Sequence, residues 1–121
     1  MLRIRRIPST TAVTSTDMDA LVVLTTVATK EDAERLGRAL VERKLAACAQ
    51  ILGPMTSIYR WKGAVQQEPE HLCLLKTRRE RFAELEAAIR ELHPYETPEI
   101  IALPVTAGSA AYLAWLEGET R

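Results

Sequence analysis

The chain reads Leu21-Val22-Val23-Leu24-Thr25-Thr26 near its start and Leu72-Cys73-Leu74-Leu75-Lys76-Thr77 further along. Both runs are rich in the aliphatic and β-branched residues that favour strands. Because successive residues of a strand point to opposite faces of its sheet, an uninterrupted apolar run predicts a strand buried on both faces. We therefore expect these two strands to lie in the middle of a sheet.

Two helices and a hairpin are predicted around this pair of strands. Apolar residues recur at helical spacing from Thr29 to Lys44 and from Thr77 to Leu92. Each stretch opens with a threonine and has an acidic residue three positions later, which is the pattern of a capping box. Between the helices, a strand from Ala46 to Trp61, interrupted near Gly53-Pro54, leads to a predicted turn at Lys62-Gly63.

The end of the chain completes the pattern of an α+β fold. A fourth strand is predicted at residues 99–106, and a short C-terminal helix follows Gly108-Ser109. The order β-α-β-β-α-β is that of the ferredoxin-like sandwich, whose usual strand order, 4-1-3-2, makes the two apolar strands central. Pro104 has no amide hydrogen to donate, which favours an edge position for the fourth strand.

The second face of this sheet requires a cover. Both main helices of the ferredoxin-like plan lie on one face, yet the two central strands are apolar on both faces: Leu21 and Val23 oppose Val22 and Leu24, and Leu72 and Leu74 oppose Cys73 and Leu75. Burying an aliphatic side chain of this size is worth about 1.5–3 kcal/mol, so four of them are too many to leave in water. Since symmetric assembly is the default for oligomers, we expect other copies of the chain to cover them.

Length and charge limit the functional classes. The 121 residues predict one domain, at residues 20–121, preceded by an Arg- and Ser/Thr-rich segment, residues 1–19, expected to be a flexible or partly docked tail. Sixteen basic residues balance sixteen acidic ones without a long run of either sign, which argues against nucleic acid as a partner. No apolar stretch approaches the twenty residues of a membrane span, and the two cysteines are expected to be reduced in the cytoplasm.

Five motifs together resemble the divalent-cation tolerance (CutA) family. They are RKLAAC at 43–48, SIYRWKG at 57–63, LKT at 75–77, HPYETPEI at 93–100 and YLAW at 112–115. The resemblance covers residues 20–118. It implies a ferredoxin-like subunit in a tight homotrimer, associated with tolerance to copper and other divalent cations. Some members of the family look like relatives of trimeric signalling proteins of the PII type.

The candidate metal ligands are His93, Glu96 and Cys48. Imidazole and carboxylate are competent ligands for divalent first-row metals, and a thiolate can hold copper. The alternative for His93 is a structural role at the end of the second helix. There the helix dipole favours the protonated ring, and a protonated ring cannot bind a metal ion. The alternative for Cys48 is that of a small apolar side chain, although the resemblance implies that it lies close to the His93 segment. Cys73 is expected in the core.

A second candidate site is a pocket between subunits, lined by Tyr59, Trp61, Lys76 and Tyr95, for a small anion or metabolite. The alternative is that Tyr59 and Trp61 only pack on the hairpin and anchor the trimer.

Two functional hypotheses follow. The first is a trimer that binds divalent cations weakly, and the second is a trimeric signalling or small-molecule-binding module. No Ser-His-Asp or Cys-His pairing and no Gly-rich phosphate loop is evident, so we do not expect an enzyme. The first strand–helix loop also has no Cys-x-x-Cys pair, which argues against a copper chaperone. Apart from a divalent cation such as copper, no cofactor is expected.

Overall fold

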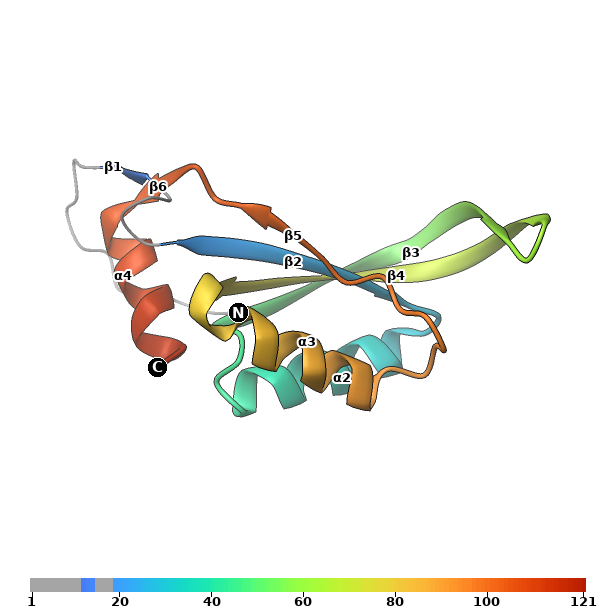
Figure 1. The fold of residues 1–121 in the computed structure, drawn as a ribbon, viewed down its shortest axis with the longest axis horizontal. Helices are drawn as coiled ribbons and strands as arrows, with labels where there is room; N and C mark the ends of the chain where they lie inside the picture. The colour runs from blue at the N-terminus through green and yellow to red at the C-terminus, as the bar shows by residue number, and fades with distance from the viewer. Residues whose placement is uncertain (1–11, 15–18) are drawn as a thin grey trace.

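The computed structural model describes residues 12–14 and 19–121, which form an α+β fold around a four-stranded antiparallel sheet (Figure 1). The strands are β2 (Ala20–Val27), β3 (Cys48–Trp61), β4 (Ala64–Arg78) and β5 (Ile101–Pro104), and the main helices are α2 (Lys30–Glu42) and α3 (Phe82–Leu92). The spatial order is β3-β4-β2-β5. This confirms the ferredoxin-like order, with both apolar strands central and Pro104 on an edge strand.

Local chemistry explains where α2 begins. The Thr29 hydroxyl accepts a hydrogen bond of 3.1 Å from the Asp32 amide, so the predicted cap is present. Further along, a Cβ on Gly37 would lie 2.9 Å from the Ala49 side chain. Glycine at this position therefore lets α2 approach β3 closely.

The predicted cap of the second main helix is wrong. Thr77 is fully buried, and its hydroxyl donates a hydrogen bond of 2.7 Å to the Leu45 carbonyl instead of capping a helix. A 3₁₀ turn at Arg79–Arg81 precedes α3, and no side chain caps it. β4 continues through Thr77, so this residue lies in the core. The pattern of nearby residues does not reveal that the strand extends this far.

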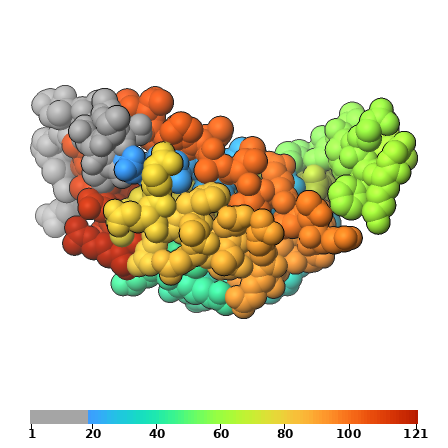
Figure 2. Space-filling model, in the orientation of Figure 1, coloured from blue at the N-terminus to red at the C-terminus, as the bar shows by residue number. Residues whose placement is uncertain are grey.

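The β3–β4 hairpin is longer than the apolar pattern indicates. β4 begins at Ala64, so residues before 72 are strand and not loop. The predicted turn is confirmed, since Lys62 and Gly63 both have positive φ, of 49° and 83°, as a two-residue hairpin turn requires. The predicted interruption of β3 is a shift of register between Leu52 and Met55. The hairpin stands out from the body as an arm (Figure 2).

The main core lies between one face of the sheet and the two helices α2 and α3 (Figure 1). Val23 and Leu75 from the central strands pack there with Leu40 of α2 and Ile89 of α3, and all four are inaccessible to water. Cys73 lies in this core as expected, and its burial raises the pKa of its thiol to about 11.

The other face of the sheet is apolar and has no helix of the main core on it. Val22, Leu24, Leu72 and Leu74 alternate with buried core residues and are partly exposed in the single chain. Leu52, Ile101 and Leu103 are exposed more fully, Leu103 to 51%. We call these seven residues the open face. Four of them lie on the two central strands, for which the sequence predicts apolar residues on both faces, and Leu52, Ile101 and Leu103 extend this surface onto β3 and β5.

A second, smaller cluster forms around the C-terminal helix α4 (Ala110–Glu119), which the Ser109 hydroxyl caps. Leu113 and Leu116 of α4 are buried there with Ala20 and Ala47. The preceding strand β6 (Ala107–Ser109) pairs antiparallel with β1 (Ala12–Thr14). Of the predicted tail, residues 1–11 and 15–18 lie outside the described residues. None of the helices in the described part of the chain has the length and apolar character that a membrane crossing requires.

Candidate functional site

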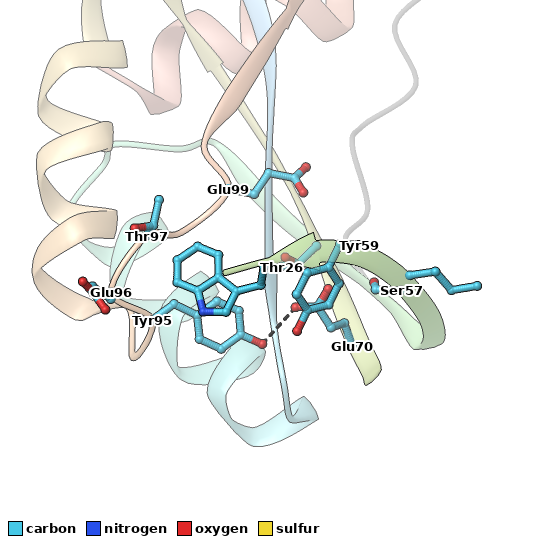
Figure 3. Close-up of a pocket in the computed structure, with 10 residues that line it drawn as sticks. Thr26, Ser57, Tyr59, Glu70, Tyr95, Glu96, Thr97 and Glu99 are labelled. Carbon is cyan, nitrogen blue, oxygen red and sulfur yellow. Dashed lines mark hydrogen bonds between the residues drawn. The ribbon is translucent and has the colours of Figure 1, made fainter. Parts of the chain in front are cut away.

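A groove of about 630 Å³ lies where the hairpin arm meets the loop that joins α3 to β5 (Figure 3). Thr26, near the end of β2, is also part of its wall. The lining residues come from three separate segments and comprise Thr26, Ser57, Ile58, Tyr59, Trp61, Glu70, Tyr95, Glu96, Thr97 and Glu99.

His93 holds the α3–β5 loop in place. Its ring is buried, Nε2 lies 2.8 Å from the Thr26 carbonyl oxygen, and Nδ1 accepts a hydrogen bond of 3.1 Å from the Tyr95 amide. Nε2 therefore carries the proton and Nδ1 does not. Burial lowers the pKa of His93, which favours this neutral form. The predicted structural role is thus present, but with a neutral ring and not a protonated one.

Both ring nitrogens of His93 are used within the chain. A metal ion needs a free lone pair on one of them. In this structure the lone pair of Nδ1 accepts the hydrogen bond from the Tyr95 amide. Direct ligation by His93 would require the Tyr95 amide to move away.

Tyr95 joins the loop to the hairpin arm. Its hydroxyl donates a hydrogen bond of 2.9 Å to a carboxylate oxygen of Glu70 on β4, which is only 8% exposed. Burial, and then the bond to Glu70, raise the pKa of Tyr95, so the phenol keeps its proton. The ring of Tyr95 also packs against that of His93, with 4.8 Å between centroids.

The groove has an acidic interior and an acidic rim. Burial raises the pKa of Glu99, and the nearby charge of Glu70 raises it further. The two carboxylates are therefore close enough to interact electrostatically. Glu96 points away from them at the edge of the groove (Figure 3). Within residues 12–14 and 19–121, no Lys or Arg lines the groove, and no ion pair involves Glu70, Glu96 or Glu99.

The structure brings together part of the predicted site. Tyr59, Trp61, Tyr95 and Glu96 line one groove, and His93 lies directly behind it.

Cys48 and Lys76 lie elsewhere. They pair with each other across β3 and β4, whereas Thr26, which His93 contacts, pairs with Leu72. Four residues of strand separate Lys76 from Leu72, or about 13 Å. Within one subunit, the expectation that Cys48 lies near the His93 segment is therefore wrong, and Lys76 does not line this groove.

Cys48 and Lys76 meet Tyr112 of α4 instead. The Cys48 sulfur lies 3.7 Å from the Tyr112 hydroxyl oxygen, and the Lys76 ammonium lies 5.7 Å from the centre of the Tyr112 ring. Burial, and then the contact with Cys48, raise the pKa of Tyr112 to about 12. These contacts tie α4 to the end of the sheet.

The carboxylates of the groove are suitable ligands for divalent cations, but they are too far apart to chelate one ion. Carboxylate oxygens are ligands for such ions. Within residues 12–14 and 19–121, however, no three His, Cys, Asp or Glu side chains gather closely enough to hold a metal ion. One subunit therefore offers separated carboxylates and no preformed chelate.

Comparison with known proteins identifies the family. The model of the CutA1 divalent ion tolerance protein family matches residues 21–119, which is nearly the whole described domain. The chain belongs to the CutA divalent-ion tolerance family.

Individual CutA relatives agree with this assignment. The chain is 48% identical to the divalent-cation tolerance protein CutA of Thermus thermophilus over 99 residues, which cover 82% of this chain and 96% of the relative. It is 40% identical to the chloroplastic CutA protein of Arabidopsis thaliana over 107 residues, 88% of this chain and 59% of that longer relative. The solved structure of CutA from Synechococcus elongatus superposes with a TM-score of 0.86 at 37% identity, covering 93% of this chain and 97% of that one.

Two groove residues of this CutA chain, Glu70 and Glu99, were not predicted. Glu99 lies inside the HPYETPEI motif, at the start of the predicted fourth strand. Glu70 precedes the apolar run at residues 72–77, so the pattern that predicts this strand does not include it. The observed β4 is longer and includes Glu70. Because successive side chains of a strand point to opposite faces, Glu70 and its neighbour His71 lie on opposite faces of the sheet.

Proposed function

We propose that this CutA-family chain works as a cytoplasmic homotrimer that binds divalent cations of the copper type weakly and contributes to tolerance of them. The observation that supports cation binding is the negative charge of the groove: three carboxylates line it, and among the described residues no basic side chain does. Such a field favours cations over anions. Among divalent first-row ions, Cu²⁺ binds most tightly to a given set of ligands, which supports copper within this class.

The proposed ligands are Glu96, from the predicted set, together with Glu70 and Glu99. His93 contributes indirectly, because its Nδ1 fixes the backbone of Tyr95 and Tyr95 in turn orients Glu70. A role for Cys48 in this site requires the thiol of another subunit.

The spacing of the carboxylates supports weak binding. Because no three potential ligands of the described residues converge, a bound ion keeps part of its water shell and contacts one or two carboxylates directly. The protein then exchanges its ions readily.

The open face supports assembly. Its seven apolar residues extend over all four strands of the sheet, and burying each is worth about 1.5–3 kcal/mol. Three copies are proposed from the family resemblance, since the physical argument requires a cover without fixing the number. The cytoplasm is proposed from the two unpaired cysteines, although the Arabidopsis thaliana relative is named as chloroplastic.

The second candidate, a trimeric signalling or small-molecule-binding module of the PII type, rests on the size of the groove. Ligand sites usually have volumes of about 300–1,000 Å³, which includes this one. A nucleotide sensor is disfavoured, however. Only the turn Lys62-Gly63 joins β3 to β4, and the acidic groove would repel phosphate.

Calorimetric titration of tag-free protein with Cu²⁺ tests the proposal. We expect Glu99→Gln to weaken binding about tenfold, because it removes a charged ligand. Glu119→Gln, on the exposed end of α4, is the matched control and should leave the affinity unchanged. Equal affinities for the wild type and Glu99→Gln would reject the groove as the cation site.

A further inference from the structure

Glu70 is a buried charge without a counter-ion. It is more than nine-tenths buried, it receives one hydrogen bond, from Tyr95, and it forms no ion pair with the described residues. An ionised carboxylate has about four acceptor positions, and a buried charge is costly unless it is paired. Among the described residues of one chain, no positive partner lies beside Glu70.

The shape of the groove indicates what kind of cation fits. A single metal ion fills a small part of 630 Å³, and the three carboxylates are spread from the interior to the rim and do not converge. A larger organic cation can fill more of this volume while its charge is attracted by both Glu70 and Glu99. The volume is that of a small-molecule site.

The aromatic walls add a second attraction. Tyr59, Trp61 and Tyr95 all line the groove, and the Tyr95 hydroxyl is aimed at Glu70 (Figure 3). A cation over the face of such a ring is attracted by its π electrons, and organic ammonium ions are suited to this contact because they are only weakly hydrated. A phenol that donates a hydrogen bond to a carboxylate has a more electron-rich ring, which strengthens the attraction.

The chain itself provides an example of this contact. The Lys62 ammonium lies 5.7 Å from the centre of the Trp61 ring, within the usual range of a cation–π interaction. One aromatic wall of the groove is thus already within reach of an alkylammonium group.

We infer that the groove binds a small organic ammonium ion, with its charge between Glu70 and Glu99 and its alkyl groups against Tyr59 and Tyr95. This inference rests on the proposed function, because it takes the same groove as a cation site, and it names a further class of cation. Glu70 and Glu99 supply the charge, and the aromatic rings select an organic ion over a hydrated metal.

The test compares choline chloride with 3,3-dimethyl-1-butanol, its neutral isostere, in the full assembled protein. Trp115→Phe serves as the parent, so that the fluorescence of Trp61 reports on the groove. We expect saturable binding of choline and at least tenfold weaker binding of the isostere. Equal responses to both compounds, or no saturable response to choline at 50 mM, would overturn the inference.

Variants separate the two cation classes. Tyr59→Leu should weaken choline binding about threefold to tenfold, while Cu²⁺ binding stays within about twofold. Glu99→Gln should weaken both, and Glu119→Gln neither. An unchanged choline affinity in Tyr59→Leu would refute the aromatic part of the site.

The two failures are distinguishable. Binding of Cu²⁺ that depends on Glu99, without binding of choline, would overturn this inference and leave the proposed function standing. Binding of choline without Cu²⁺ would reject the divalent-cation function instead. Silence with both would reject the groove as a cation site of either kind.

Discussion

The Tyr95 hydroxyl and the Glu70 carboxylate are joined by a hydrogen bond of 2.9 Å between residues 25 positions apart in the chain. This bond connects the α3–β5 loop to the hairpin arm, and it is the only hydrogen bond in the described structure that the Glu70 side chain makes. The shape of the groove therefore depends on it.

We predict that Tyr95→Phe destabilises the protein by about 1–3 kcal/mol, because a buried carboxylate loses its donor. Urea unfolding of Tyr95→Phe, Glu70→Gln and the double variant measures the coupling between the two side chains. Strictly additive effects would show that the bond contributes nothing to stability.

We predict that His93 makes stability rise with pH below neutrality. Its pKa is lowered in the folded protein from the ordinary value of 6.5, so between the two values the unfolded chain binds more protons. Stability then falls as the pH drops from about 6.5 toward the folded pKa, and it is complete above 6.5.

Unfolding midpoints in urea between pH 5 and 8 check this prediction. His93→Gln should be less stable and should have a flatter dependence on pH than the wild type. The same slope in His93→Gln and the wild type would contradict the assignment.

We predict that cation binding to the groove weakens in acid sooner than an ordinary glutamate would allow. Burial and the charge of Glu70 raise the pKa of Glu99, so Glu99 becomes protonated while free carboxylates are still ionised. A bound cation favours the ionised form, and its affinity must fall as protons compete. Titrations with Cu²⁺ from pH 7 down to 5 should show this loss in the wild type, and a smaller one in Glu99→Gln.

We predict that a charge on the open face breaks the assembly and leaves the subunit folded. Leu103→Glu would bring three carboxylates into the interface of a trimer, whereas in one chain this side chain is already 51% exposed. Sedimentation velocity at micromolar concentration should find trimers for the wild type and single folded copies for Leu103→Glu. Val41→Glu, an exposed apolar position on α2, is the control and should remain trimeric. A wild type that sediments as a single folded copy would refute the assembly.

Most of the fold could be predicted from local patterns. Runs of apolar residues predicted β2 and the buried end of β4, and helical spacing predicted α2 and α3. The predicted turn at Lys62-Gly63 is also confirmed. The errors came where a residue has a distant partner. Thr77 has the sequence of a cap, but its hydroxyl bonds to Leu45, 32 residues away.

The candidate site was predicted less completely. Tyr59, Tyr95 and Glu96 were expected at a site, and they line the groove. Glu70 was missed because the polar half of β4 lacks the apolar alternation that reveals a strand. Cys48 was expected near His93, but the register of β3 against β4 sends it toward Tyr112.

The sequence by itself determined the order of the strands and helices, the central position of the two apolar strands and the family. Those properties follow from side-chain periodicity, turn residues and short motifs, all of which act between neighbours in the chain. Only the tertiary structure decided that Glu70 and Glu99 share a groove and that both nitrogens of His93 are occupied. Such contacts depend on strand register and on side-chain direction between residues as far apart as 67 positions, and no local pattern encodes that distance.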